Sequence, residues 1–347
     1  MEALLEHFFA QVHWTVLLAA IATSLLALGK AADILVDEAV EFSESVRIPQ
    51  MVVGATIVSL GTTAPEAAVS VLAAIEGSPG LALGNSVGSV IADTGLILGL
   101  ACLVAPLQLD PKIVNRQGWI QIGAGLLMVA LSTPWGSLQG TFSAGGRLSQ
   151  TAGFGLLALL AAYLYLSVRW AGQHRQETSR PKGHPARRAP LLTLLKLVAA
   201  TAGVVIFAQI VIPGVTEAAK RIEVPESVIA GTLVAFGTSL PELVTALTAA
   251  RRGQGGLAVG NVIGADILNV LFVAGAAAAV TPGGLEASPA FFTVLYPAML
   301  LILIVFRVGV FVSGDTLKRP FGLVLVAAYV AYLAATYQFL PDGPATG

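Results

Sequence analysis

The sequence has 347 residues, of which 56% are hydrophobic and only 11% are charged, and its mean hydropathy is +0.82. Soluble domains average about 25% charged residues, so this composition excludes a soluble globular protein and predicts a polytopic membrane protein. The formal net charge of −1 and the lack of a nucleic-acid-binding motif predict no nucleic-acid partner, and the sequence indicates no cofactor and no protein partner. The single cysteine, Cys102, excludes an intramolecular disulfide and a cysteine metal cluster, and we expect it to be buried.

Ten apolar segments are each long enough to cross a bilayer core as a helix, which takes about 20 residues. In the first half of the chain we expect spans at residues 14–38, 49–75, 80–105, 115–133 and 150–170. In the second half we expect them at residues 190–219, 225–250, 257–280, 289–310 and 319–339. The N-terminus lacks the basic start of a cleaved signal peptide, so the first span is expected to be retained. The predicted fold is therefore an all-α protein of ten transmembrane helices.

A basic, polar linker at residues 171–189 divides these spans into two groups of five. We expect residues 1–170 to form one five-helix repeat and residues 190–347 to form the other. Because five is odd, the second group must start from the opposite side of the membrane, which makes the repeats inverted. Many secondary transporters have this plan and bind their ions near the midplane, between the repeats.

Lysine and arginine residues in the loops predict the orientation, because they are enriched on the cytoplasmic side. With both termini outside, the cytoplasmic loops hold Arg47, Lys112, Arg116, the cluster at 169–196, Arg251, Arg252, Arg307, Lys318 and Arg319. The outer loops hold only Arg147, Lys220 and Arg221. We therefore expect a multi-pass protein of the inner (plasma) membrane with both termini extracytoplasmic. The central basic loop is interpreted as a topology signal and linker, with a regulatory or anionic-lipid role as the alternative.

One stretch of sequence occurs twice, at a constant offset of 176 residues. The first copy (α-repeat 1, about residues 54–100) reads GTTAPE at Gly61–Glu66 and GNSVGSVIAD at Gly84–Asp93. The second copy (α-repeat 2, about residues 230–276) reads GTSLPE at Gly237–Glu242 and GNVIGADILN at Gly260–Asn269. Each copy places a glutamate inside an apolar run, and an acid at membrane depth indicates a functional site.

The first motif of each copy combines a proline, hydroxyl side chains and the glutamate. Pro65 and Pro241 are expected to break spans two and seven and to free backbone carbonyls around Ser59 and Leu60, and around Ala235 and Phe236. Together with the hydroxyls of Thr62, Thr63, Thr238 and Ser239, these carbonyls would supply hard oxygen ligands. Calcium prefers such ligands, as does sodium, and the lack of His and Cys in the motifs argues against zinc, copper or iron–sulfur chemistry.

The second motif of each copy contains glycines, an asparagine and a polar helix face. The glycines are interpreted as packing positions. Asn85 and Asn261 are expected to cap or bind the broken backbone across the interface, with direct ion contact as the alternative. Ser89 and Asp93 share one helix face. Their counterparts are Ala265 and Asn269, and Asp266 is an additional acid.

These two stretches resemble the α-repeats of the cation/calcium exchangers, and most closely those of the prokaryotic sodium/calcium exchangers. The resemblance is close over spans two, three, seven and eight and extends to the ten-helix inverted-repeat layout. It implies that one calcium ion is exchanged for several sodium ions by alternating access. It also implies that broken helices two, three, seven and eight form a fixed core, across which spans one and six slide as a gate.

The resemblance also assigns ligands. It places a central calcium site at Glu66 and Glu242, with backbone oxygens near Thr62 and Thr238. It places flanking sodium sites at Ser59, Thr63, Ser89, Ala235, Ser239 and the pair Asp93 and Asn269. This chain departs from the family pattern in three ways: Ala265 lacks a hydroxyl, Asp93 and Asn269 look exchanged between the halves, and Asp266 is extra. The two carboxylates assigned to the calcium site, Glu66 and Glu242, are both present, and the identity of the counter-ion is left open.

Two other functions are alternatives. A cation/proton antiporter requires an acid that takes up a proton, for which Asp93 and Asp266 are the candidates. An ion channel also uses broken helices, although paired acids in inverted halves favour alternating access. An enzyme is not expected, because no Ser/His pairing or HExxH-type site is present.

Three charged residues outside the two α-repeats are also interpreted. Lys30 and Asp33, spaced i, i+3 in span one, are interpreted as an ion pair or as a snorkelling lysine. A lysine that visits the acid cluster as a tethered cation is the alternative. Glu217 is expected near the outer mouth, where it would attract cations.

Overall fold

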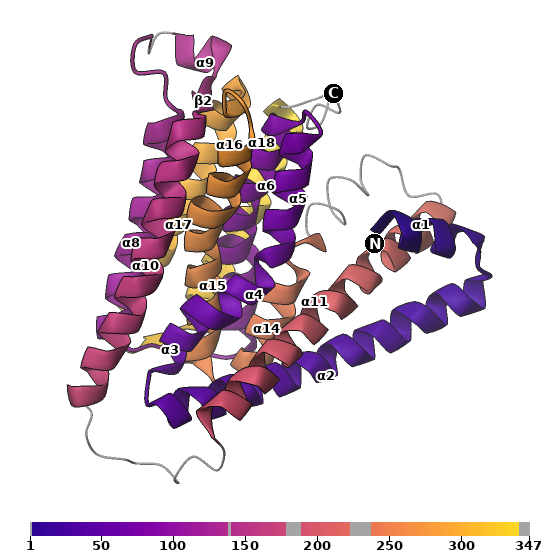
Figure 1. Cartoon of the computed structure of the whole chain (residues 1–347), viewed down its shortest axis with the longest axis vertical. Helices are drawn as coiled ribbons and strands as arrows, with labels where there is room; N and C mark the ends of the chain where they lie inside the picture. Colours follow the sequence, from indigo (N-terminus) through magenta and orange to yellow (C-terminus); the bar gives the residue numbers. More distant parts are fainter. Residues whose placement is uncertain (1, 138–139, 178–188, 223–236, 340–347) are drawn as a thin grey trace.

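The computed structural model describes residues 2–137, 140–177, 189–222 and 237–339, and it is helical almost throughout (Figure 1). A helix satisfies its own backbone hydrogen bonds, which a chain in hydrocarbon requires. The loops add two short antiparallel sheets that the sequence did not predict. One pairs β1 (Leu107–Gln108) with β4 (Thr316–Leu317), and the other pairs β2 (Gly146–Leu148) with β3 (Leu285–Ala287).

The first half of the chain begins with a short helix and one long helix and continues with several broken ones. Its helices are α1 (Glu2–Gln11), α2 (Trp14–Val46), α3 (Gln50–Val53), α4 (Ser59–Thr62), α5 (Ala64–Ile75), α6 (Pro79–Ile91), α7 (Leu98–Val104), α8 (Pro111–Ser132), α9 (Thr141–Ala144) and α10 (Gln150–Glu177). Two π-helical segments, η1 (Gly54–Val58) and η2 (Ala92–Ile97), lie within the second and third spans. Such segments are frequent at functional sites.

The second half of the chain has a similar order of elements. Its helices are α11 (Pro190–Arg221), α14 (Leu240–Arg251), α15 (Gly255–Leu268), α16 (Gly275–Val280), α17 (Tyr296–Ser313) and α18 (Arg319–Phe339). The π-helical segments η5 (Asn269–Ala274) and η6 (Phe291–Leu295) interrupt the eighth and ninth expected spans. The third and eighth spans therefore share an α–π–α pattern.

Seven helical runs in the described part of the chain are long and apolar enough to cross a membrane. They match the spans expected at 14–38, 80–105, 150–170, 190–219, 257–280, 289–310 and 319–339. The bent pair Gln50–Thr62 and Ala64–Ile75, whose axes differ by 43°, would make an eighth crossing if the two helices form one span. The span expected at 115–133 corresponds to α8, which is not among these runs, and part of the span expected at 225–250 lies outside the described residues. The count of ten therefore stays a prediction.

The helices form a compact bundle flanked by an oblique pair. Figure 1 shows α2 and α11 side by side, running obliquely away from the other helices. Inside the bundle, the two halves of the chain pack crosswise. Helix α5 lies against η5 and α16, and α14 lies against η2 and α7. Each glutamate-bearing helix therefore contacts the second motif of the opposite half.

Glycines permit the closest of these contacts. A Cβ on Gly264 would lie 2.5 Å from the Cα atom of Ala55, and one on Gly54 would lie 2.7 Å from the carbonyl oxygen of Leu257. Gly260 likewise abuts the backbone of Met51. Span two therefore packs directly on α15. The packing role expected for the glycines is confirmed for Gly260 and Gly264, whereas a Cβ on Gly88 would meet no described atom of another element within 4 Å.

The two small sheets lie at opposite ends of the bundle. Gly255, at the start of α15, packs against the backbone of Gln108 in β1, whereas β3 follows the end of α16. The run from Gly255 to Val280 has 26 residues and so is about 39 Å long at 1.5 Å per residue. Cys102 is buried near the first sheet, as expected, and its thiol lies 3.1 Å from the carbonyl oxygen of Lys318.

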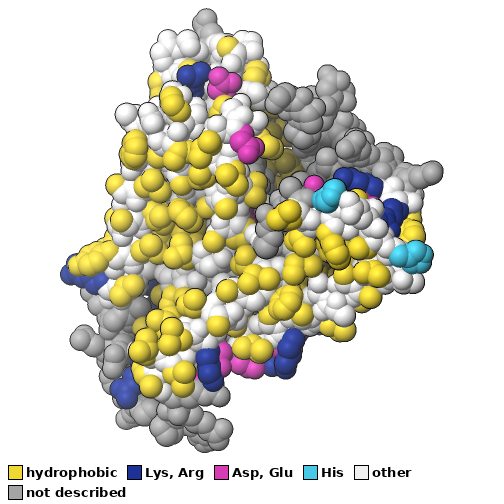
Figure 2. Space-filling model, turned by 45° about the vertical axis from the view of Figure 1, so that its right-hand side comes forward, with side chains coloured by type: hydrophobic (Ala, Val, Ile, Leu, Met, Phe, Trp, Pro, Cys, Tyr) yellow, Lys and Arg dark blue, Asp and Glu magenta, His cyan; other side chains and the backbone are white. Residues whose placement is uncertain are grey.

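The surface matches a protein surrounded by lipid. Hydrophobic side chains cover most of the face shown in Figure 2, and charged side chains gather toward its margins. Large apolar side chains such as Leu26 and Val312 are at least 70% exposed. Soluble monomers rarely expose apolar patches of this extent, so this surface is best accommodated in a bilayer.

Candidate ion-binding site

Both glutamates occupy the first turn of a helix that begins directly after a break. Helix α5 begins at Ala64 after a break at Thr63, and α14 begins at Leu240 after Ser239. Pro65 and Pro241 lie in the first turn, where a missing N–H is tolerated. A helix N-terminus also favours a nearby negative charge. The two halves therefore present their acids in the same local geometry.

The expectation that the carbonyl of Ser59 is free is wrong. Its oxygen accepts a hydrogen bond from the backbone N–H of Thr63 at 2.9 Å and another from the Thr62 hydroxyl at 3.3 Å. The physical reason is that a proline removes only its own N–H, so Pro65 affects the carbonyl four residues earlier, at Gly61. The corresponding positions Ala235 and Phe236 lie outside the described residues.

The two glutamates are bonded crosswise between the halves. The Thr63 hydroxyl donates to Oε1 of Glu242 at 3.2 Å, and the Ser239 hydroxyl donates to Oε1 of Glu66 at 3.4 Å. Thr62 also interacts with Glu242. Both carboxylates are fully buried, and Oε2 of each has no hydrogen-bond partner in the described structure. A buried carboxylate oxygen without a partner is costly, and a cation placed between the two would satisfy both.

The aspartate–asparagine pair is also joined across the halves. Asp93 lies at the start of η2 and Asn269 at the start of η5. The Asn269 amide donates to Oδ2 of Asp93 at 3.2 Å, and Ser239 interacts with Asp93 as well. Oδ1 of Asp93 and Oδ1 of Asn269 are buried without partners among the described residues. This pair therefore offers two further oxygens beside the glutamates.

The other residues expected at the site are placed as follows. Ser59, Thr62 and Ser89 are buried, and the Ser59 hydroxyl donates to the carbonyl of Thr56 at 3.3 Å. Thr238 is half-buried, and its hydroxyl has no hydrogen-bond partner in the described structure. Ala235 lies outside the described residues. Of the hydroxyls of the first motif, those of Thr62, Thr63 and Ser239 interact with the glutamates.

The two asparagines of the second motif differ. The Asn85 amide donates to the Ser70 hydroxyl at 3.0 Å and to the carbonyl of Glu66 at 3.5 Å. It therefore binds backbone, as expected, but in its own half rather than across the interface. Asn261 is buried, and neither atom of its amide has a partner in the described structure.

Three residues that the repeat did not identify contact this region. Thr94 and Gln121 both bond Oδ2 of the extra acid, Asp266. The Tyr163 hydroxyl of α10 donates to the carbonyl of Ala55 in η1 at 3.0 Å. None of them lies in a matched motif. A glutamine in the middle of a predicted span was the available signal for Gln121, because such residues usually face a polar interior.

The ligand set consists entirely of oxygen atoms. In the described part of the chain, no three His, Cys, Asp or Glu side chains converge as they do in a metal centre. A bound ion must therefore take hydroxyl, amide and backbone oxygens in addition to the carboxylates. Calcium binds mixed sets of six to eight oxygens of this kind.

Helix α11 passes over both breaks. Gly61 abuts Thr201 of α11, and a Cβ on Gly237 would lie 2.9 Å from Ile212 of the same helix. Helix α2 contacts α14 and packs along α11. The oblique pair therefore packs against the breaks in both halves.

The ion pair expected between Lys30 and Asp33 is not formed in the described structure. Asp33 instead pairs with Arg252, the C-cap residue of α14, at 3.4 Å between Oδ1 and Nε, and Arg252 also pairs with Asp37. Lys30 is exposed on α2. The physical reason is that Asp33 faces the end of α14, where a guanidinium is within reach, whereas Lys30 lies on the exposed face of its helix.

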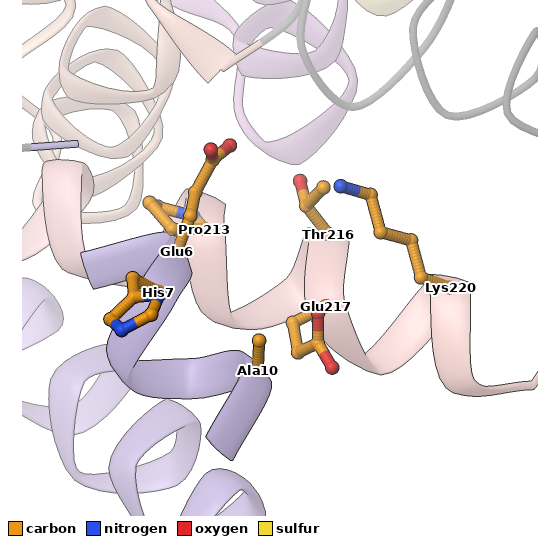
Figure 3. Close-up of a pocket in the computed structure, with 7 residues that line it drawn as sticks. All are labelled: Glu6, His7, Ala10, Pro213, Thr216, Glu217 and Lys220. Atoms are coloured by element: carbon orange, nitrogen blue, oxygen red, sulfur yellow. The ribbon is translucent and has the colours of Figure 1, made fainter. Parts of the chain in front are cut away.

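A separate pocket of about 320 Å³ lies between α1 and α11 (Figure 3). Its lining includes Glu6, His7, Thr216 and Lys220, and none of the residues expected at the ion site. Glu217, also in the lining, forms an ion pair with Arg221 at 2.7 Å. That pairing partly neutralises the acid that was expected to attract cations.

Comparisons with known proteins match this chain over most of its length. The model of a family described as sodium/calcium exchanger protein matches residues 16–169 and 192–338. Inner membrane protein YrbG of Escherichia coli is 32% identical over 332 residues, which cover 92% of this chain and 98% of that protein. Sodium/calcium exchanger MaX1 of Methanosarcina acetivorans is 29% identical, covering 90% of this chain and 96% of that protein. A solved structure of the sodium-calcium exchanger NCX_Mj is 25% identical with a TM-score of 0.77, covering 93% of this chain and 99% of that one.

Proposed function

Because this chain belongs to the sodium/calcium exchanger family, we propose that it is a secondary antiporter that exchanges calcium for sodium by alternating access. The repeated acids and the resemblance to the cation/calcium exchangers predicted this function. The observation that carries it is the crosswise bonding of Glu66 and Glu242, which leaves one unpartnered oxygen on each carboxylate in the described structure. In this proposal the two carboxylates bind a divalent cation directly as the transported ion, and no resident cofactor is needed.

The two glutamates hold calcium in this proposal. Glu66 and Glu242 together carry two negative charges, which match one calcium ion. Backbone oxygens near Thr62 and Thr238 complete part of its shell, because calcium requires more oxygens than two carboxylates provide. The burial of both carboxylates supports this role, since an unneutralised acid pair at this depth would be strongly unfavourable.

Sodium occupies positions that flank calcium. Its ligands are Ser59, Thr63, Ser89, Ala235, Ser239, Asp93 and Asn269. Thr63 and Ser239 bridge to the glutamates, and Ser239 also reaches Asp93. Sodium and calcium thus share ligands. Competition for shared ligands couples the two ions, because binding one set displaces the other.

The chain is built from two inverted five-helix repeats of ten transmembrane helices in total, residues 1–170 and 190–347, joined by the linker at 171–189. The two sheets support this arrangement. At one end β1, which follows α7, pairs with β4 between α17 and α18. At the other end β3, which follows α16, pairs with β2 between α8 and α10. A two-fold axis in the membrane plane would relate β1 to β3 and β4 to β2, and would therefore place the two sheets at opposite ends.

The protein lies in the inner (plasma) membrane with both termini extracytoplasmic. The similarity to inner membrane protein YrbG of Escherichia coli supports the choice of membrane, and the loop charges support the orientation. Helices α2 and α11 act as the gate, because they pack on each other more than on the bundle and pass over both breaks (Figure 1).

The test is calcium uptake into proteoliposomes. Vesicles loaded with sodium should take up ⁴⁵Ca²⁺ when diluted into sodium-free medium, and Glu66→Gln or Glu242→Gln should abolish the uptake. Removing one charge leaves the other carboxylate unable to neutralise a divalent ion, so we expect losses of at least about 100-fold. Glu286→Gln is the matched control, since this exposed acid pairs with Arg147 at the surface. Uptake that survives both glutamate changes would sink the proposal.

A second arm separates sodium from proton coupling. With sodium absent on both sides, a pH gradient alone should drive no calcium uptake. Uptake driven by the pH gradient would instead support the cation/proton alternative. Flux without any counter-ion gradient, and without saturation, would indicate a channel.

A further inference from the structure

Beside the symmetric site lies a polar cluster that exists in one half only. It consists of Asp266 on α15, Thr94 in η2 and Gln121 on α8, and all three side chains are at most 2% exposed. The positions offset by 176 residues are Val90, Val270 and Pro297. Each polar residue of the cluster therefore has an apolar counterpart, so the cluster is not a product of the repeat.

The hydrogen bonds of the cluster converge on one oxygen. Thr94 and Gln121 both donate to Oδ2 of Asp266, and the Gln121 amide also donates to the Thr94 hydroxyl at 3.1 Å. These bonds fix the carboxylate and orient the amide. Three elements from both halves of the chain thereby hold one acid in place.

The remaining oxygens of the cluster have no partner among the described residues. Oδ1 of Asp266 and Oε1 of Gln121 are buried without a hydrogen bond. One turn earlier on α8, on the same helix face, Gln117 is 0% exposed and neither atom of its amide is bonded. Buried polar groups without partners are rare, and a bound ion or water is the kind of partner that would satisfy them.

We propose that Asp266, Gln121 and Thr94 bind one monovalent alkali cation beside the calcium site. One carboxylate supplies a single negative charge, which a monovalent ion neutralises. The amide and hydroxyl oxygens supply uncharged ligands of the kind that sodium and potassium accept. Histidine, cysteine and a second carboxylate are missing from the cluster, so a transition metal or calcium is not favoured.

The position of the cluster links it to transport. Asp266 interacts electrostatically with Asp93, which belongs to the flanking sodium positions. A cation at Asp266 lowers the negative charge that Asp93 experiences and so changes the affinity of the neighbouring site. This inference rests on the proposed function, because it assumes that ions reach Asp93 from solution.

The number of ions bound per protein tests the inference. Purified full-length protein in phosphatidylcholine nanodiscs would be titrated with ²²Na⁺ and, separately, with ⁸⁶Rb⁺ as a potassium analogue. N-methyl-D-glucamine would hold the ionic strength constant. We expect Asp266→Asn to lower the count of one of these isotopes by one per protein. The isotope that responds identifies the ion as sodium-like or potassium-like.

Two further variants keep the test valid if Asp266→Asn does not fold. Gln121→Leu and Thr94→Val retain the Asp266 carboxylate, and each should lower the affinity for the same ion at least about tenfold. Gln150→Leu is the matched control, because it removes a glutamine that bonds Ala279 outside the cluster. It should leave both isotope counts at the wild-type values.

Three outcomes have distinct meanings. If the cluster variants keep the wild-type counts and affinities of both isotopes, the cluster is a structural network and the inference is wrong. If Asp266→Asn removes bound ⁴⁵Ca²⁺, the acid belongs to the calcium site and the inference is also wrong. If the proposed function is wrong, Glu66→Gln and Glu242→Gln should leave ⁴⁵Ca²⁺ binding intact, and this result is separate from the other two.

Discussion

The two halves of the ion site are alike at the glutamates and unlike around them. Glu66 and Glu242 have the same burial, the same position after a break and reciprocal hydroxyl donors. Around them, Asp93 faces Asn269, and Asp266 stands where the other half has Val90. The symmetric part suits the ion that needs two charges. The asymmetric part can differ because monovalent ions need fewer charges, and we expect the choice of counter-ion to be made there.

Among the residues around the two glutamates, the largest effect is expected from exchanging the acid and the amide between the halves. Asp93→Asn should lower sodium-driven calcium uptake about 10- to 100-fold, because it removes a buried charge from the flanking site. The double variant Asp93→Asn with Asn269→Asp should recover most of the uptake, since the two side chains are in hydrogen-bond contact and the charge moves only to the adjacent position.

Proteoliposome uptake measures both variants, with Asn269→Asp alone as the control. A double variant no better than Asp93→Asn would show that the two halves are not interchangeable even at this pair.

A second effect should appear in packing. Gly264→Ala places a methyl group 2.5 Å from the Cα atom of Ala55, so α15 and η1 must separate. Overpacking of this kind costs about 1–3 kcal/mol, and the thermal midpoint in detergent should fall. Gly88→Ala is the control in the equivalent position, where no described atom of another element lies within 4 Å. Equal destabilisation by both variants would contradict the difference between the halves.

The hydroxyl donors should give smaller and matched effects. Thr63→Val and Ser239→Ala each remove one bond to the glutamate of the other half. Because each variant loses a hydrogen bond to a charged group, we expect the affinity for calcium to fall about fivefold or more, measured as ⁴⁵Ca²⁺ binding. Thr281→Val is the control, because its hydroxyl bonds its own helix. If the losses for Thr63→Val and Ser239→Ala differ by more than an order of magnitude, the calcium site does not bind its ion symmetrically.

The smallest effect is expected at the end of α14. Arg252 pairs with Asp33 and Asp37 of α2, whereas the equivalent position in the first half is the acid Glu76. These side chains are between 36% and 67% exposed, so the pairs contribute about 0–1 kcal/mol. Arg252→Gln should change the uptake rate only a few-fold, and choline chloride should reduce the difference by screening. Glu76→Gln should have no effect on the rate. A loss as large as that of Asp93→Asn would mean that Arg252 does more than hold the gate helix.

Much of the architecture follows from the sequence because its signals are local. Apolar length predicted the helical runs, and prolines predicted the breaks before α5 and α14. The π-helical segments were not predicted, because apolar periodicity in a fully buried helix does not distinguish a wide turn from a normal one. The freed carbonyl at Ser59 was wrongly predicted, because the break is too short to release its bond from Thr63.

By itself, the sequence determined that two copies of one acid-bearing stretch lie in opposite halves, and it identified Glu66 and Glu242 as the central pair. A constant offset carries that information without any knowledge of contacts. Only the tertiary structure decided that each glutamate takes its hydroxyl donor from the other half, and that Asp266 is held by Gln121. The two residues of each such pair are separated by more than a hundred residues, so only the tertiary packing brings them together. For Asp266 and Gln121 it is the packing of α15 on α8.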